Sequence, residues 1–172
     1  MDVGELHIII GPMFSGKTTT LIELSKYYTN PLFINYLLDT RYDMTMLSTH
    51  DLIQVPCIQV INLCDVSINS IIEADAIFIN EGQFFPDLLE KTKEMVETYN
   101  KKVYVCGLDG DYRREPFGDI LNLITICDTV EKRKARCGLC NNHAPFTHRI
   151  SSHTQQIVIG TNEYIPVCRQ CL

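Results

Sequence analysis

The stretch from Gly11 to Thr18, GPMFSGKT, is the feature that most limits what this chain can fold into. Two glycines with four residues between them, followed by Lys and a hydroxyl residue, form a loop whose backbone N–H groups turn inward around phosphate groups. The preceding LHIII is apolar and β-branched, as in a buried strand, and the following KTTTLIELSKYY carries apolar residues close to helical spacing. A strand, a phosphate loop and a helix in this order predict a nucleotide-binding α/β fold.

Two side chains of this loop are expected to have roles of their own. Lys17 would reach the β- and γ-phosphates of a nucleotide, and the Thr18 hydroxyl would bind Mg²⁺. A glycine turn with an incidental lysine is the alternative, which the flanking strand and helix disfavour. The predicted phosphate-binding residues are Gly11, Pro12, Met13, Phe14, Ser15, Gly16, Lys17 and Thr18.

Apolar runs alternate with segments of helical pattern over the first three quarters of the chain. This alternation predicts a parallel sheet with helices on both faces and ligands at the C-terminal ends of the strands. Further strands are expected within 31–40, 57–63, 75–82 and 101–108, with helices within 65–74 and 84–100 and a loop at 39–51. The pattern weakens near Asp128, so we assign 1–130 to an α/β domain and 131–172 to a small β subdomain.

Composition and charge disfavour nucleic acid and membranes as partners. The chain has 172 residues, 45% apolar and 21% charged, with a formal net charge of -6, which disfavours nucleic acid or an anionic membrane. The one basic run, EKRKAR at 131–136, is better explained as a solvated strand face. No apolar run is long enough to span a membrane, and the N-terminus lacks the pattern of a signal peptide.

Eight cysteines in a chain without an export signal are expected to be reduced thiols. Four of them lie among apolar residues and are predicted to pack in the core, namely Cys57, Cys64, Cys106 and Cys127. The other four form two pairs near the C-terminal end, CGLC and CRQC, which can wrap one tetrahedral Zn²⁺. Four thiolates leave no open position, so we predict a structural zinc rather than two disulfides, with the ligands Cys137, Cys140, Cys168 and Cys171.

A carboxylate is expected close to the phosphates. The apolar run in DAIFINEGQFF leads directly to Asn80 and Glu81, which places Glu81 at the C-terminal edge of the sheet. A carboxylate there can accept a proton from an attacking hydroxyl or hold a metal-bound water. A solvated strand-end glutamate is the alternative, and the nearby phosphate loop favours the functional interpretation.

These motifs together resemble the thymidine kinases of the small P-loop and zinc type, found in vertebrates, poxviruses and many bacteria. GPMFSGKT, DTRY with THD, EGQFFPD, LDGDYRREPFGDILNL and the two cysteine pairs occur in the family's order from about Leu6 to Leu172. EGQFFPD and PFGDILNL are far more specific than the phosphate loop.

The resemblance implies that ATP donates its γ-phosphoryl group to the 5′-hydroxyl of thymidine, giving dTMP and ADP for DNA precursor salvage. Glu81 matches the catalytic base, and Asp39, Arg41, Thr18 and Asn80 match positions near magnesium and the phosphates. The resemblance also implies that a lasso loop between the cysteine pairs, around 156–164, closes over the base. It further implies a cytoplasmic homotetramer, cellular or viral, with feedback inhibition by dTTP.

The resemblance also implies a thymidine site. Aromatic rings suit it because they offer flat apolar area to a base. Backbone groups of 156–160 recognise the base edge, and Arg149 is a further candidate contact. The matching positions are Phe84, Leu108, Tyr112, Phe117, Thr147, Gln156, Ile157, Val158, Ile159, Gly160 and Tyr164.

Three positions depart from the family pattern. Asn80 stands where the family usually has Asp, which predicts weaker Mg²⁺ binding. Tyr112 stands where many relatives have Phe, so its hydroxyl needs a partner if it is buried. The sequence ends at Leu172, without the long C-terminal tail that some relatives use for regulation.

Three other functions remain open at this point. Asn80 is compatible with a catalytically weak ATP- and thymidine-binding protein. Zinc ribbons often touch nucleic acid, so a nucleic-acid-dependent ATPase is a second alternative, which the acidic charge disfavours. A third keeps the kinase chemistry and changes the acceptor to deoxyuridine, deoxycytidine or an analogue.

Overall fold

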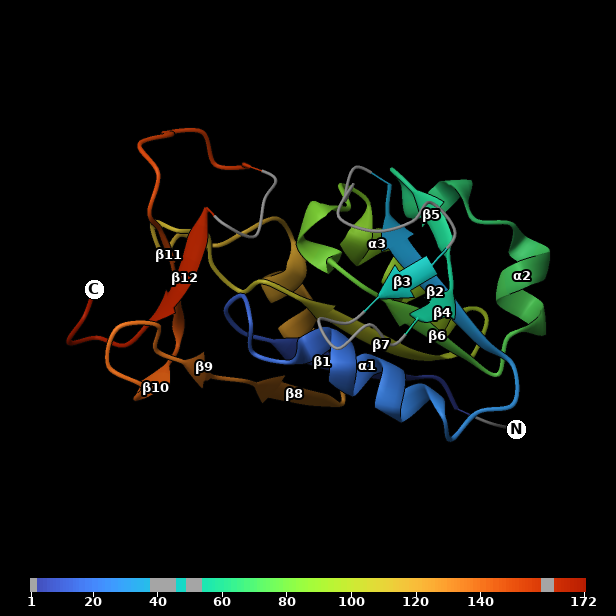
Figure 1. Cartoon of the computed structure of the whole chain (residues 1–172). Helices are drawn as coiled ribbons and strands as arrows, with labels where there is room; N and C mark the ends of the chain where they lie inside the picture. Colours follow the sequence, from blue (N-terminus) through green and yellow to red (C-terminus); the bar gives the residue numbers. More distant parts are fainter. Residues whose placement is uncertain (1–2, 38–45, 49–53, 159–162) are drawn as a thin grey trace.

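Six parallel strands form the central sheet, in the order β5-β2-β6-β7-β1-β8 (Figure 1). This computed structural model describes residues 3–37, 46–48, 54–158 and 163–172. The five predicted strands are present, and the sixth, β8, is one that the sequence pattern did not indicate. The bounds are β1 Glu5–Ile10, β2 Pro31–Tyr36, β5 Ile58–Val60, β6 Ala76–Ile79, β7 Lys102–Gly107 and β8 Thr129–Lys132.

The sheet is covered on both faces, which confirms the predicted fold class. One face packs against helix α1 (Lys17–Ser25) and the hairpin of β3 (Met46–Ser48) and β4 (Gln54–Pro56), through residues such as Leu21, Phe33 and Leu47. The other face packs against the remaining helices and buries Ile77, Leu88 and Met95. Those helices are η1 (Leu63–Asp65), α2 (Ile68–Glu73), α3 (Leu88–Glu97) and η3 (Ile120–Thr125).

Burial on both faces explains why the central strands are so apolar. All four residues of β6 are buried, and Ile77 and Phe78 are 0% exposed on opposite faces. A strand covered on both sides needs apolar residues at every position, not at alternate ones. Because the strands are parallel, the segments that follow β1, β6 and β7 emerge at one edge of the sheet. The residues emerging there are Gly11, Asn80 and Leu108.

The two predicted helices begin and end close to the expected places. Ser67 is the N-cap residue of α2, while Asp65 lies in the preceding turn η1. Leu88 and Met95 of α3 are buried, and Leu89 and Val96 pack against the same core. The 3₁₀ helix η3 was not anticipated.

A small β subdomain forms the end of the molecule opposite the N-terminus (Figure 1). Strands β9 (Ala135–Arg136) and β10 (His143–Ala144) pair antiparallel, as do β11 (Phe146–Arg149) and β12 (Tyr164–Val167). Its buried cluster is small and includes two of the paired cysteines, with the members Ala135, Cys137, Ala144, Val167 and Cys168. The predicted division at residue 130 falls within β8, a strand of the central sheet.

The core-packing prediction for the scattered cysteines is correct for only part of the set. Cys106 is buried in the sheet, and Cys57 and Cys127 are partly buried against the core. Cys64 is exposed, so the prediction is wrong there. The turn η1 buries Leu63 and directs the next residue outward.

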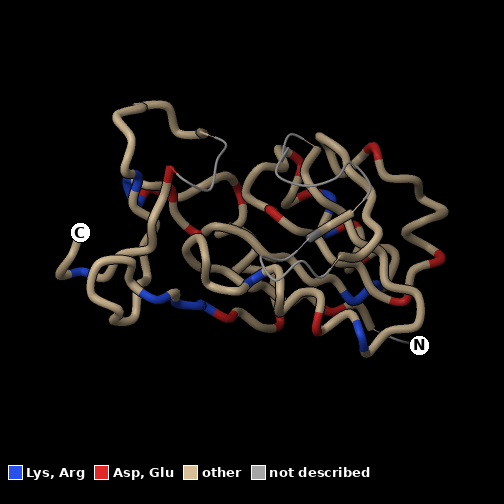
Figure 2. The backbone as a smooth tube through the Cα atoms, in the orientation of Figure 1, with Lys and Arg blue, Asp and Glu red and all other residues tan. Residues whose placement is uncertain are grey.

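The basic run lies on the surface of β8 and β9, as predicted. Figure 2 shows it as a blue stretch leading toward the C-terminal subdomain. Lys132 pairs with Asp109 at 2.5 Å, and Arg133 lies 3.5 Å from Glu131. Part of the positive charge of the basic run is therefore compensated. Within the described residues, no helix has the length and apolar character needed to cross a bilayer.

Candidate active site and zinc site

The phosphate loop has the backbone shape that its glycines permit. Gly11 has φ 151°, and a Cβ built there would lie 2.7 Å from the carbonyl oxygen of Arg133, so only glycine fits. Gly16 has φ 75° and caps α1, while Phe14, with φ 62°, is exposed. The Lys17 ammonium donates to the carbonyl of Pro12 at 2.7 Å and therefore lies over the loop itself.

A buried polar row connects this loop to the ends of the central strands. The Thr18 hydroxyl donates to Asn80 Oδ1 at 3.1 Å, and the Cys106 thiol donates to the same oxygen at 3.0 Å. Asn80 Nδ2 donates to Asn35 Oδ1 at 2.9 Å. Burial, with a smaller contribution from the Glu81 charge, raises the pKa of Cys106 to about 12, so its thiol stays protonated and remains a donor.

Glu81 lies two residues after the end of β6 and adopts a left-handed conformation, with φ 55°. It precedes the short helix η2 (Gly82–Phe84), from which Gln83 reaches back. Gln83 Nε2 donates to Glu81 Oε2 at 2.7 Å, and its Oε1 accepts from the backbone N–H of Leu108 at 2.9 Å. Gln83 is only 3% exposed, so the orientation of the Glu81 carboxylate is tied to β6 and β7.

Two of the predicted thymidine-site aromatics are in contact. The Phe84 ring meets that of Phe117 edge-on, with 5.4 Å between centroids. Tyr36, at the end of β2, stacks on Phe84 at 5.2 Å. These three rings form an apolar cluster, and one of them, Phe84, closely follows Glu81 in the sequence.

A tight turn carries Tyr112 beyond this cluster. Asp111 Oδ1 accepts from the backbone N–H groups of Arg113 and Glu115, at 2.8 and 3.1 Å, which closes the turn. Asp111 Oδ2 accepts from Gln156 Nε2 at 3.1 Å. The Tyr112 hydroxyl donates to a loop carbonyl, so it has the partner that its polarity requires.

The β subdomain also reaches the phosphate loop. Thr147, on β11, accepts a hydrogen bond from the backbone N–H of Met13 at 3.0 Å. Thr147 is buried, and Arg149 two residues later contacts Tyr112 and Tyr164. Residues from both parts of the chain therefore meet beside the loop.

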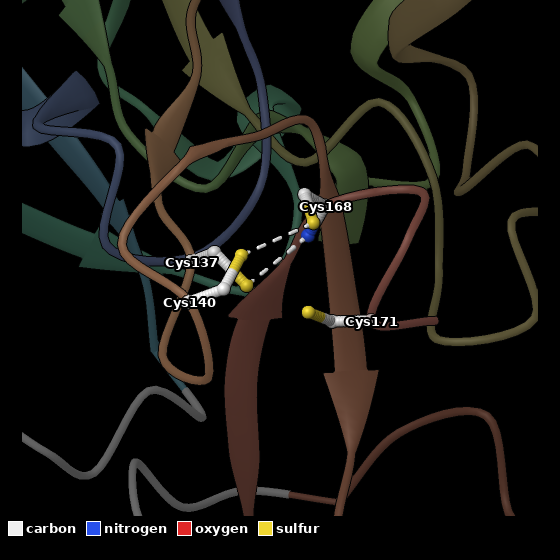
Figure 3. Close-up of side chains that lie close together, drawn as sticks. All are labelled: Cys137, Cys140, Cys168 and Cys171. Carbon is white, nitrogen blue, oxygen red and sulfur yellow. Dashed lines mark hydrogen bonds between the residues drawn. The ribbon is translucent and has the colours of Figure 1, made fainter.

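Four cysteine sulfurs converge at the end of the subdomain, as Figure 3 shows. They all lie within 4.8 Å of one another, which is close to the spacing of about 3.8 Å expected for a tetrahedron with Zn–S bonds of about 2.3 Å. Burial opposes ionisation, yet hydrogen bonds from the backbone N–H groups of Leu139, Cys168 and Cys140 lower the pKa of Cys137 to about 6. A thiolate is the form that binds zinc, so the cluster formed by Cys137, Cys140, Cys168 and Cys171 suits this metal.

Comparison with known proteins decides the family. The family model described as thymidine kinase matches residues 4–172. This chain belongs to the thymidine kinase family. It is 44% identical to a thymidine kinase of Yaba monkey tumor virus, covering 98% of this chain and 94% of that protein. It is 42% identical to one of Monkeypox virus, covering 99% and 98%, and 40% identical to one of Oryza sativa subsp. japonica, covering 97% and 65%.

Several residues at the site were not anticipated from the thymidine kinase motifs. Asn35 and Cys106 hold the Asn80 amide, and Tyr36 stacks on Phe84. Gln83 lies inside the quoted motif EGQFFPD, and its position two residues after a candidate base is a signal that could have drawn attention to it. Four of the predicted residues, Asp39, Arg41, Ile159 and Gly160, lie outside the described part of the chain.

Proposed function

We propose that this protein is a thymidine kinase that transfers the γ-phosphoryl group of ATP to the 5′-hydroxyl of thymidine, giving dTMP and ADP. The observation that carries the proposal is similarity over nearly the whole chain to thymidine kinases. The two viral proteins and the plant protein named above are 40–44% identical to this chain. The hydrogen bond from Thr18 to Asn80 adds support, because it joins the phosphate loop to the residue preceding Glu81.

Glu81 is the proposed general base, which takes the proton from the 5′-hydroxyl as that oxygen attacks the γ-phosphorus. Gln83 donates to Oε2 of this carboxylate and so fixes the orientation of the proposed base. General-base catalysis of this kind contributes about 10²–10⁴-fold to a rate.

The phosphate loop, Gly11 to Thr18, is the proposed ATP-phosphate site. Lys17 would exchange its bond to the Pro12 carbonyl for phosphate oxygens. The Thr18 hydroxyl donates a hydrogen bond to Asn80 Oδ1. The lone pairs of the hydroxyl oxygen therefore remain for a cation. Mg²⁺ bound there would neutralise charge on the β- and γ-phosphates.

The acceptor site is proposed on Phe84 and Phe117, with Tyr112, Thr147 and Tyr164 from the surrounding segments. The ring contacts support it, because a flat apolar surface suits a base. Backbone groups near Val158 would recognise the base edge and reject bases with reversed donors and acceptors. The remaining proposed contacts are Leu108, Gln156, Ile157, Ile159 and Gly160.

The zinc has a structural role in this proposal. Its four ligands join the two ends of a subdomain whose buried cluster is small, so metal binding supplies much of the folding free energy. Feedback inhibition by dTTP, a homotetrameric assembly and a cytoplasmic location complete the proposal, and all three rest on the family alone.

The test is a panel of nucleosides with ATP and Mg²⁺, scored for monophosphate product. Thymidine should be the preferred acceptor. A preference for deoxyuridine or deoxycytidine would keep the chemistry and change the substrate. Product formed equally by the wild type and by Glu81→Gln would instead favour a binding protein, and ATP hydrolysis stimulated by DNA without nucleoside product would favour a nucleic-acid-dependent ATPase.

A further inference from the structure

The guanidinium of Arg149 is the centre of a cluster that the proposed chemistry does not use. Arg149 ends β11 and is only 5% exposed. Its Cζ lies 3.8 Å from the ring centroid of Tyr112 and 5.0 Å from that of Tyr164. A guanidinium over aromatic faces is attracted by the ring quadrupoles, more strongly when it is desolvated. These contacts fix the side chain in one place.

The same guanidinium gathers the backbone of the following loop. Nη1 donates to the carbonyl of His153 at 2.9 Å and to that of Gln155, and Nη2 donates to the carbonyl of Gln156 at 2.9 Å. Hydrogen bonds from a charged donor are stronger than neutral ones. One side chain therefore holds three neighbouring carbonyls in a segment that has no helix or strand of its own.

Two tyrosine hydroxyls bond to the same segment. Tyr164 accepts from Arg149 Nη2 at 2.5 Å and donates to the carbonyl of Val158 at 3.1 Å. Tyr112 donates to the carbonyl of Thr154 at 2.9 Å, and Arg113 donates both to this hydroxyl and to the same carbonyl. The backbone of 153–158 is thus held from outside, by β11, β12 and the turn that carries Tyr112.

The partners found for Arg149 are carbonyls, a hydroxyl and rings, and among the described residues its Nε has no hydrogen-bond partner. A buried cation is costly unless it is well bonded, so the position of Arg149 requires compensating hydrogen bonds. The shape of the guanidinium allows them, because a planar fork can serve several carbonyls at once, whereas a lysine ammonium is a single point charge.

We propose that Arg149 is a positioning residue that holds the 153–158 segment in the arrangement that receives the nucleoside, and that the Tyr112 hydroxyl is a second anchor of that segment. The proposal rests on the proposed function only in naming the nucleoside as the ligand. In this proposal Arg149 acts on the nucleoside through the loop that it holds.

The test compares Arg149→Met and Arg149→Lys with Arg169→Met. Arg169 also lies over a ring of the subdomain, that of Phe146 at 4.8 Å, but it is exposed and serves as the matched control. Zinc content, the KM values for thymidine and ATP, and thermolysin cleavage before Ile157 and Val158 are measured on full-length protein.

Arg149→Met should raise the thymidine KM and the cleavage rate by at least about tenfold each, because tenfold is the effect of losing one charge-assisted hydrogen bond and the substitution removes four. Arg149→Lys should show nearly the same thymidine KM and cleavage rate as Arg149→Met. The ATP KM and the zinc content should be unchanged in both Arg149 variants. Arg169→Met should leave all four quantities as in the wild type.

Tyr112→Phe covers the case in which Arg149→Met fails to fold, because it removes one hydroxyl and keeps the ring. It should speed cleavage and raise the thymidine KM by about fivefold, the effect of one neutral hydrogen bond. Unchanged cleavage in the folded variants overturns the proposal, and so does faster cleavage with an unchanged thymidine KM. A wild type that phosphorylates no nucleoside defeats the proposed function instead, and the cleavage rates still decide whether Arg149 anchors the loop.

Discussion

The sheet domain and the cysteine-bearing subdomain hold their site residues by different means. Asn80 and Glu81 follow a strand whose four residues are all buried, so the packing of the core fixes where they lie. The 153–158 segment has no such support, and its position depends on bonds from Arg149, Tyr112 and Tyr164. A large core places a backbone through many weak contacts, whereas a small subdomain relies on a few strong ones.

This difference implies that the two regions respond differently to substitution. Removing a functional group from the sheet domain should change the chemistry and leave the fold intact. Removing one strong link from the subdomain should disorder the acceptor side and leave the nucleotide side in place.

Glu81→Gln should have the largest effect on turnover. The substitution keeps the size of the side chain and an oxygen that can accept from Gln83, but it removes the proposed base. We expect kcat to fall by about 10²–10⁴-fold, with no change in the thermal unfolding temperature. Glu97→Gln, at an exposed position of α3, is the control and should behave as the wild type. A large loss of stability in Glu81→Gln would show that the two regions do not differ in the way described.

Loss of zinc should come next in size. Cys140→Ser should abolish stoichiometric zinc binding and raise the thymidine KM by roughly tenfold or more, because a disordered loop must be ordered on binding. Affinity for a fluorescent ATP analogue, measured separately, should stay within about twofold, since losing the single bond between Thr147 and Met13 has a small effect. An equal loss of nucleotide binding would mean that the phosphate loop also depends on the metal.

Asn80→Asp should have a smaller effect that is confined to magnesium. A carboxylate beside Thr18 adds a charge that attracts a divalent cation. The buried Asn35 Nδ2 has no hydrogen-bond partner within the part of the chain that the structure describes, and a turn of that amide would let it donate to the new carboxylate. We expect the Mg²⁺ concentration for half-maximal rate to fall by about fivefold. The idea fails if the two titration curves coincide.

The smallest effect concerns pH. Burial raises the pKa of Cys106 from 9.0 to about 12, so the unfolded chain releases this proton at lower pH than the folded chain. The free energy of unfolding must then decrease as pH rises above 9, because the unfolded state binds fewer protons. Between pH 8 and pH 10 the wild type should lose about 1 kcal/mol more of its free energy of unfolding than Cys106→Ser in denaturant titrations. Parallel losses would indicate that the thiol ionises equally in both states.

Most of the sheet could be predicted because its signals are local. The glycine spacing from Gly11 to Gly16 and the apolar run before Glu81 each define a strand end without reference to the rest of the chain. Strand β8 escaped notice because all four of its residues are exposed, as expected for a strand at the edge of a sheet. The turn η3 was missed because 3₁₀ segments are short and have a weak sequence pattern.

The contacts within the site were harder to foresee. Asn35 and Cys106 lie on β2 and β7, and Asn80 directly follows β6, so only the strand order β2-β6-β7 brings them together. The role of Arg149 is of the same kind, since nothing in the sequence around it indicates that three loop carbonyls turn toward its side chain.

The connection between the two regions limits how the site can open. Strand β8 ends at Lys132 and β9 begins at Ala135, and the backbone N–H of Arg133 donates to the carbonyl of Ile10 at 2.8 Å. A joint this short, and bonded to the central sheet, offers no hinge for swinging the zinc-bearing end as a rigid body. Entry of a nucleoside would then depend on local rearrangement within the described segment 153–158, not on a rigid-body swing.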